Sequence, residues 1–241
     1  MKRALVFQHM DHDHPGRFLD FFAEDGIVPE MVRLWEGQSI PKFAPYDFLF
    51  VLGGAQDAWE EDKHPWMIAE KAAIREWVWD RAKPYFGVCL GHQLLCDSLG
   101  GEVALAVEPE VGVFDVSLTD DGKEHALFSG VELHNKVMQW HWAEVKWAPQ
   151  GAKVLATSSR TAIQSIAIDG HAVSTQFHCE FTPQTMAAWS SMPGYLASLE
   201  KQNGAGAYRR LVDKATPLMP QMTKMTRRIY DNLMVATGLR K

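Results

Sequence analysis

The sequence predicts an α/β protein of three layers, in which helices flank a mostly parallel central sheet. Before residue 100, strand-like apolar runs alternate with segments of helical periodicity, which is the pattern of βαβ units. One run passes straight into a helical pattern through a cysteine set between two glycines. The 241 residues suffice for one sizeable core, and no linker or repeat divides them. We expect one domain over 1–241, with a core over about 1–195 and a helical extension over about 196–241.

The first half of the chain is expected to alternate strands and helices. Apolar residues at helical spacing over 18–22, closed by Gly26, predict a short amphipathic helix. The same spacing over 65–79 predicts a longer one. The strands expected here are 3–9, 28–35, 47–52 and 85–88.

The second half is expected to be richer in strands and to end in helices. Thr182 suits a helix N-cap and Pro183 the first helical position, so a helix begins there and carries Met186 and Trp189 inward. A helical stretch over 208–233, interrupted near two prolines, is expected to cover the sheet. The strands expected in this half are 103–107, 111–118, 137–142, 154–158, 162–168 and 172–181.

The composition argues against several classes of protein. A formal net charge of −6 gives no electrostatic footprint for nucleic acid. No segment is long and apolar enough to cross a membrane, and charged residues follow the N-terminus too soon for a signal peptide, so a cytoplasmic location is expected. Cys89, Cys96 and Cys179 are odd in number and lack metal-type pairing, which disfavours a disulfide framework.

Cys89 lies between Gly87 and Gly91 where a strand pattern changes to a helix pattern, which is the spacing of a nucleophile elbow. Such a turn strains the backbone of the nucleophile, and the glycines avoid collisions with strand and helix. The thiol would lie at the first turn of a helix, whose partial positive charge favours the thiolate. From this stretch alone, a cysteine buried in a glycine-rich turn is an equal alternative.

Two loops follow predicted strands at the sheet edge where α/β proteins place their sites. The loop over 8–14 contains three histidines and two aspartates, which suit zinc or manganese. Its spacing is not that of a metal motif, so loop capping or a pocket rim is favoured and no metal is predicted. Gly53 and Gly54 end another strand, where backbone N–H groups either form an oxyanion hole or simply turn the chain.

A histidine and a glutamate, His178 and Glu180, end the predicted strand 172–181. Residues two apart in an extended segment point to the same side, so Glu180 can hold the imidazole of His178. An activated cysteine needs such a base and a group that orients it. This pair alone would be weak support for catalysis.

Taken together, the segments Gly87–Gln93 and Gln176–Glu180 resemble the two signatures of the class I glutamine amidotransferase family, in the same order and at similar separation. The family includes GMP synthase-type amidotransferase domains and γ-glutamyl peptidases, and the resemblance implies a flavodoxin-like fold. It covers the chain from the first strand to about Trp189. It continues through 53–54, 110–112 and 139–142.

The resemblance implies a reaction and assigns its residues. Cys89 would attack the side-chain amide of glutamine or of a γ-glutamyl compound, and His178, oriented by Glu180, would move the proton. Backbone N–H groups of Gly54 and Leu90 would hold the oxyanion. Water would then hydrolyse the γ-glutamyl thioester.

The resemblance also implies the ligands of the site. Gln93 and His141 fall where the family lines its glutamine pocket. No cofactor is implied, and the partners expected are a small-molecule substrate and, in one alternative, an ammonia-accepting synthetase. Neither nucleic acid nor a membrane is expected as a partner.

The chain departs from the family pattern at two places. Cys179 stands between His178 and Glu180 where proline is usual, so it would loosen this loop or add a second thiol near the nucleophile. After His141, relatives often have glycine and then aspartate, whereas this chain has Trp142, Ala143 and Glu144, so the acceptor side of the pocket is expected to differ in shape and polarity.

Three functions remain open from the sequence. The chain has no phosphate-binding loop of the G-x-x-x-x-G-K-[ST] type, so we expect a stand-alone amidase unit. Trp140, Trp142 and Trp189 favour a hydrolase with room for an organic leaving amine over a glutaminase subunit that feeds ammonia to a partner. A catalytically silent metabolite-binding module is the third possibility.

Overall fold

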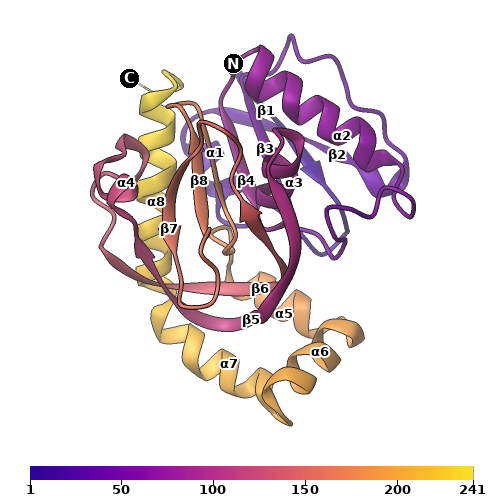
Figure 1. Ribbon diagram of the computed structural model, residues 1–241, viewed down its shortest axis with the longest axis vertical. Coiled ribbons are helices and arrows are strands. Elements are labelled where there is room, and N and C mark those ends of the chain that lie inside the picture. The colour runs from indigo at the N-terminus through magenta and orange to yellow at the C-terminus, as the bar shows by residue number, and fades with distance from the viewer. Residues whose placement is uncertain (241) are drawn as a thin grey trace.

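The computed structural model describes residues 1–240, in which nine strands form one sheet in the order β2-β1-β3-β4-β9-β8-β7-β5-β6 (Figure 1). The strands from β2 to β9 pair in parallel, and those from β9 to β6 pair antiparallel. The predicted α/β class is therefore confirmed, with a sheet that is parallel in one half only. The strands are β1 (Lys2–Gln8), β2 (Ile27–Arg33), β3 (Phe48–Val51), β4 (Tyr85–Val88), β5 (Glu102–Leu118), β6 (His134–Trp147), β7 (Lys153–Thr157), β8 (Ser165–Ile168) and β9 (Ala172–Thr175).

Helices cover both faces of the parallel half, because every residue of its central strand β3 is apolar and buried. Along β3, Phe48 and Phe50 pack on the side of α1 and α8, whereas Leu49 and Val51 pack on the side of α2 and α3. The helices are α1 (Phe18–Glu24), α2 (Trp66–Arg75), α3 (Leu90–Ser98), α4 (Asp120–Glu124), α5 (Pro183–Ser190), α6 (Pro193–Asn203), α7 (Ala207–Ala215) and α8 (Met219–Ala236).

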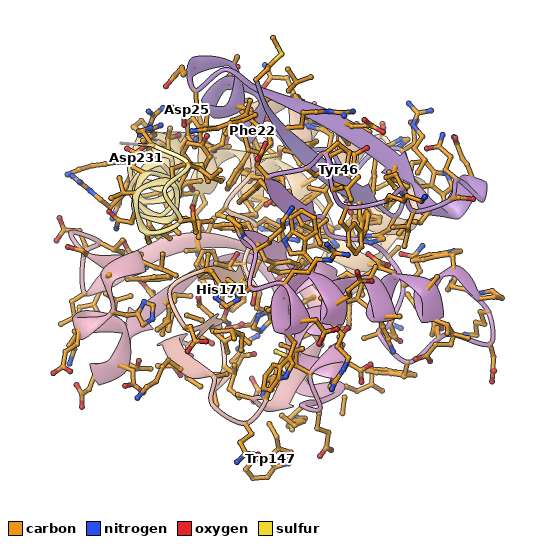
Figure 2. All side chains as sticks on the ribbon, turned by 90° about the horizontal axis from the view of Figure 1, so that it is seen from above. Phe22, Asp25, Tyr46, Trp147, His171 and Asp231 are labelled. Carbon is orange, nitrogen blue, oxygen red and sulfur yellow. The ribbon has the colours of Figure 1, made fainter. Side chains whose placement is uncertain are left out.

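The C-terminal helices belong to two different cores. Helices α5, α6 and α7 pack below the long strands β5 and β6 (Figure 1). Helix α8 buries Ile229 and Tyr230 completely against α1 and the sheet. Arg240 then bonds Asp25 and Asp231, which lie together at this end of the molecule (Figure 2). Residues of the predicted extension thus complete the main core.

Two sequence predictions about elements need correction, and one is confirmed. The stretches 103–107 and 111–118 form one strand, β5, whose register against β6 shifts between Leu105 and Glu110. Strand β9 ends at Thr175 and not at residue 181, because the chain bends away to bring His178 over the sheet edge. The interruption predicted in the C-terminal helical stretch is found at 216–218, where Pro217 cannot continue α7, whereas Pro220 lies in the first turn of α8.

The start of α5 follows its predicted cap. The Thr182 side chain accepts a hydrogen bond from the Thr185 N–H, and Pro183 takes the first helical position. Met186 and Trp189 are buried, as expected from the helical spacing. None of the helices in residues 1–240 combines the length and apolarity needed to cross a membrane.

Candidate active site

Cys89 occupies a strained turn between β4 and α3. Its φ of 51° and ψ of −105° lie in a region that residues with a side chain rarely adopt. A β-carbon on Gly91 would lie 2.3 Å from the Val51 carbonyl oxygen, and one on Gly87 would lie 2.7 Å from the Gly91 carbonyl oxygen. The Cys89 N–H donates to the Thr175 carbonyl at 2.8 Å, which ties the turn to β9. Both glycines are therefore sterically required, as the elbow spacing predicts.

The bend after β9 brings a histidine to the thiol. The Nδ1–H of His178 donates to Glu180 Oε1 at 2.6 Å, and the ring lies beside Cys89, since a β-carbon on Gly53 would lie 3.2 Å from His178 Cε1 and 3.6 Å from Cys89 Cβ. Burial disfavours the imidazolium, but Glu180 and Cys89 outweigh it and raise the pKa of His178 well above its usual value. Its two neighbours thus favour the protonated form of His178.

Two backbone N–H groups flank the thiol without an acceptor. Within residues 1–240, neither the Gly54 N–H nor the Leu90 N–H donates to another group of the chain. A β-carbon on Gly54 would lie 2.7 Å from Leu90 Cδ2, so the two residues are immediate neighbours. Both line the same cavity as Cys89. Free N–H groups beside a nucleophile are the usual components of an oxyanion hole.

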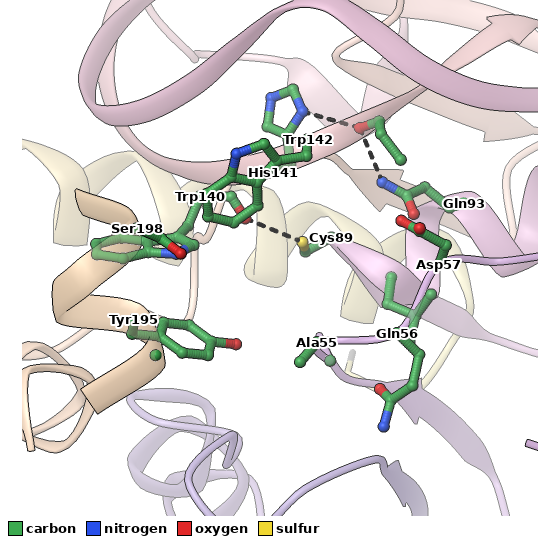
Figure 3. A pocket seen from close by; sticks show the side chains of 14 residues that line it. Ala55, Gln56, Asp57, Cys89, Gln93, Trp140, His141, Trp142, Tyr195 and Ser198 are labelled. Atoms are coloured by element: carbon green, nitrogen blue, oxygen red, sulfur yellow. Dashed lines mark hydrogen bonds between the residues drawn. The ribbon is translucent and has the colours of Figure 1, made fainter. Parts of the chain in front are cut away.

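The cavity over Cys89 has a volume of about 320 Å³ and is shown in Figure 3. Gln56 and Asp57 form one wall, and Trp140, Trp142 and Tyr195 form the opposite side (Figure 3). This size suits an amino acid with a small substituent. Among the described residues that line it, none is lysine or arginine, and Asp57 is the one acidic residue.

Most of the chain matches the model of one protein family. Residues 24–189 match the model of glutamine amidotransferase class-I. The chain belongs to the class I glutamine amidotransferase family. Members of this family are glutamine amidotransferases or hydrolases, so an enzyme that acts on glutamine-type amides is indicated in general terms.

The names of the chain's relatives indicate two kinds of function, glutamine amidotransfer and γ-glutamyl peptide hydrolysis. The chain is 29% identical to the glutamine amidotransferase-like protein YfeJ of Salmonella typhimurium over 76% of this chain and 78% of that protein. It is 28% identical to a glutamine-hydrolysing GMP synthase subunit of Sulfolobus acidocaldarius, over 63% and 76% of the two chains. It is 25% identical to gamma-glutamyl peptidase 2 of Arabidopsis thaliana, over 70% and 68%.

A solved amidotransferase has the same fold over nearly the whole chain. The crystal structure of a glutamine amidotransferase from Thermotoga maritima superposes with a TM-score of 0.86 at 27% identity. The superposition covers 96% of this chain and 97% of that one, so the C-terminal helices are included.

The two predicted pocket residues, Gln93 and His141, line the cavity over Cys89, but their polar groups are bonded to other groups of the chain. Nδ1 of His141 donates to the Ala143 carbonyl at 2.9 Å, and its Nε2 lies 3.1 Å from buried Glu110. Gln93 donates to the same Ala143 carbonyl at 3.1 Å (Figure 3). These bonds hold the segment after Trp140 against α3.

Cys179, at the position of the family's proline, does not supply a second thiol to the cavity. Its side chain is buried in the core below the sheet edge, and its sulfur lies 3.5 Å from Thr175 Oγ1. Burial raises the pKa of the Cys179 thiol far above its usual value. The His178 N–H donates to the Met138 carbonyl at 2.9 Å, so the loop stays anchored without proline.

The sequence prediction missed three residues of the site. Gln176 donates to Cys89 Sγ at 3.7 Å and accepts from Gln93 at 3.1 Å. Asp13, which the sequence places on a loop of uncertain role, is buried beside His178. Tyr195 of α6 stacks on Trp140 with ring centroids 5.4 Å apart. Gln176 belongs to the signature segment 176–180, but its contact with the thiol was not predicted, and no local motif marks Asp13 or Tyr195, which reach the site from distant segments.

Proposed function

We propose that this protein hydrolyses the γ-amide of glutamine or of a γ-glutamyl compound through a thioester on Cys89. The observation that carries the proposal is one arrangement: a strained cysteine, a histidine beside it, and a carboxylate bonded to that histidine. Nucleophile, base and orienting group thus lie together, the arrangement that covalent amide hydrolysis needs.

The reaction has two stages. The Cys89 thiolate attacks the amide carbon, and the Gly54 and Leu90 N–H groups bind the oxyanion that forms. His178 gives its proton to the departing nitrogen as the C–N bond breaks, which releases ammonia or an amine and leaves the γ-glutamyl thioester. Neutral His178 then takes a proton from water, whose oxygen attacks the thioester carbon, and the thiolate departs.

The cavity wall supports a substrate that carries an α-amino group. Asp57 has no hydrogen-bonded cation in residues 1–240, and it lines the cavity together with Cys89. An ammonium group of the substrate would neutralise this carboxylate. We therefore assign Asp57 to the α-ammonium of the γ-glutamyl group.

The side of the cavity near Trp142 supports an organic amine, and not only ammonia, as the leaving group. Trp142 and Ser198 line both the cavity over Cys89 and an adjoining surface hollow, which Lys201 and Gln202 complete. The Trp142 side chain is 37% exposed, so an amine leaving group has an accessible aromatic surface beside it. A glutaminase subunit that passes ammonia to a synthetase is the alternative, because a GMP synthase subunit is one of the relatives.

Steady-state release of ammonia from glutamine and of amine from a γ-glutamyl anilide tests the proposal. Cys89→Ala and His178→Ala should each lower kcat by about 10³-fold or more. Amine release without glutamine turnover would exclude the ammonia donor. Turnover of neither substrate would indicate a silent binding module or an enzyme that needs its partner, and full activity in His178→Ala would refute the assigned base.

A further inference from the structure

A third buried histidine–carboxylate pair, besides His178–Glu180 and His141–Glu110, lies behind the glycine loop that faces Cys89. His9 follows β1 and Glu70 lies on α2, and both side chains are completely buried. His9 Nε2 lies 2.8 Å from Glu70 Oε1, and the ring of Trp66 stacks on the imidazole with centroids 5.6 Å apart. Burying an ionisable pair costs free energy that an apolar pair would not, so its presence here calls for a reason.

The other nitrogen of His9 contacts the backbone of that loop. Nδ1 lies 2.7 Å from the Gly53 carbonyl oxygen. A carbonyl can only accept, so Nδ1 carries a proton and donates it to this bond. The bond to Glu70 at the far side of the ring holds the imidazole in place for this contact.

The Gly53 carbonyl and the Gly54 N–H belong to one peptide unit. The unit is planar and trans, so a bond that fixes the carbonyl also fixes the N–H, which points the opposite way. Neither flanking residue has a β-carbon to restrict its rotation. An external hydrogen bond is therefore what holds this peptide in one orientation.

We propose that His9, held by Glu70, is a positioning residue that keeps the Gly54 N–H directed at the oxyanion formed on Cys89. The proposal rests on the proposed function, in which Gly54 is an oxyanion donor. A donor that is fixed before the reaction stabilises the developing charge without reorganisation. Donation to the carbonyl also polarises the N–H of the same peptide.

Two matched double variants isolate the hydrogen bond. In His9→Asn/Glu70→Gln, the asparagine Nδ2 takes the place of the imidazole Nδ1 and still donates to Gly53. In His9→Leu/Glu70→Gln, a side chain of similar size has no donor. Both variants lack the buried charge, so they differ only in the bond to the peptide.

The expected result is a difference in kcat. The leucine variant should turn over a γ-glutamyl anilide about 10- to 100-fold more slowly than the asparagine variant, with KM changed little, since one oxyanion donor is worth about 10²- to 10³-fold. Alkylation of Cys89 by iodoacetamide should proceed equally in both, because displacement of iodide from a saturated carbon forms no oxyanion. Equal alkylation also shows that the thiol and its fold are intact.

Other outcomes would refute the positioning role of His9 or the proposed hydrolysis of γ-glutamyl compounds. Equal kcat values in the two variants, or a leucine variant that is slow in alkylation as well, would refute positioning by His9. If the unaltered protein hydrolyses no γ-glutamyl substrate, the proposed function fails, and crystal structures of the two variants decide the positioning. A Gly53–Gly54 peptide rotated only in the leucine variant supports it, and an unrotated peptide in both refutes it.

Discussion

Asp13 and His178 approach the same point above Gly53. A β-carbon on Gly53 would lie 3.3 Å from Asp13 Oδ2 and 3.2 Å from His178 Cε1. Asp13 Oδ1 accepts from the Trp189 indole N–H at 3.1 Å, and Trp189 packs edge-on against His178 with centroids 4.7 Å apart. Burial raises the pKa of Asp13 and the nearby His178 opposes that rise. The base of the proposed reaction therefore lies between two carboxylates, Glu180 and Asp13.

Replacing Asp13 by asparagine should destabilise the protonated form of His178 and so lower its pKa. We expect kcat/KM to fall about tenfold, and the pH dependence that reports His178 to move to lower pH, because a neighbouring negative charge is worth on the order of one pKa unit. The pH profile of kcat/KM measures this. Asp11→Asn is the control on the same loop, since its side chain is 78% exposed and lies 3.9 Å from His12. An unchanged profile in Asp13→Asn would show that the carboxylate does not act on His178.

Only one of the three cysteines should react with iodoacetamide in the folded protein. Cys89 lines a cavity, whereas burial raises the pKa of both Cys96 and Cys179 far above the usual value. The intact mass should therefore increase by one carbamidomethyl group, and by none in Cys89→Ala. Cys179→Ala should keep its activity and its single label. Labelling of Cys179 at the rate of Cys89 would contradict its buried position.

The parts of the site that are local in the sequence were predictable, and the parts that depend on distant packing were not. The elbow at Cys89 depends on glycines two residues away, so its spacing is visible in the sequence. His178 and Glu180 do lie together, although the alternation of a strand was the wrong reason, because β9 ends at Thr175. The bend that follows β9 depends on contacts to β6 that no periodicity reveals.

The same distinction explains the histidine-rich loop and the aromatic residues. The loop 8–14 contains three histidines and two aspartates, and the sequence does not show which of them are buried. His9 and Asp13 are buried because they bond Glu70 of α2 and Trp189 of α5. The three tryptophans were expected near the pocket. Trp140 and Trp142 line it, whereas Trp189 packs behind His178.

A methyl group at Gly91 should destabilise the protein severely. It would lie 2.3 Å from the Val51 carbonyl oxygen, and neither β3 nor α3 can move without disturbing both cores. We expect Gly91→Ala to lower the free energy of unfolding by about 3 kcal/mol or more. Gly170→Ala is the matched control, because nothing lies within 4 Å of a β-carbon there. Urea denaturation compares the two, and equal midpoints would contradict the close approach of β3 and α3.

Acidification should destabilise the protein through His92, on the first turn of α3. Burial lowers the pKa of His92 from 6.5 to about 3, and its Nδ1 lies 2.8 Å from Ser174 Oγ. Because the folded pKa is depressed, the unfolded chain binds the proton first as the pH falls below 6.5. The contribution to stability is then lost at about 1.4 kcal/mol per pH unit until about pH 3.

His92→Asn keeps a donor near Ser174 and removes the titrating ring. We expect this variant to be less stable than the unaltered protein at pH 7, because of the lost side-chain volume. Between pH 6.5 and 4.5, its free energy of unfolding should fall by about 2 to 3 kcal/mol less than that of the unaltered protein. Urea denaturation at several pH values measures the difference in slope. His12→Asn, at a partly exposed histidine, should leave the slope unchanged. Parallel slopes for His92→Asn and the unaltered protein would mean that His92 is protonated in the folded state, or that other groups govern the acid transition.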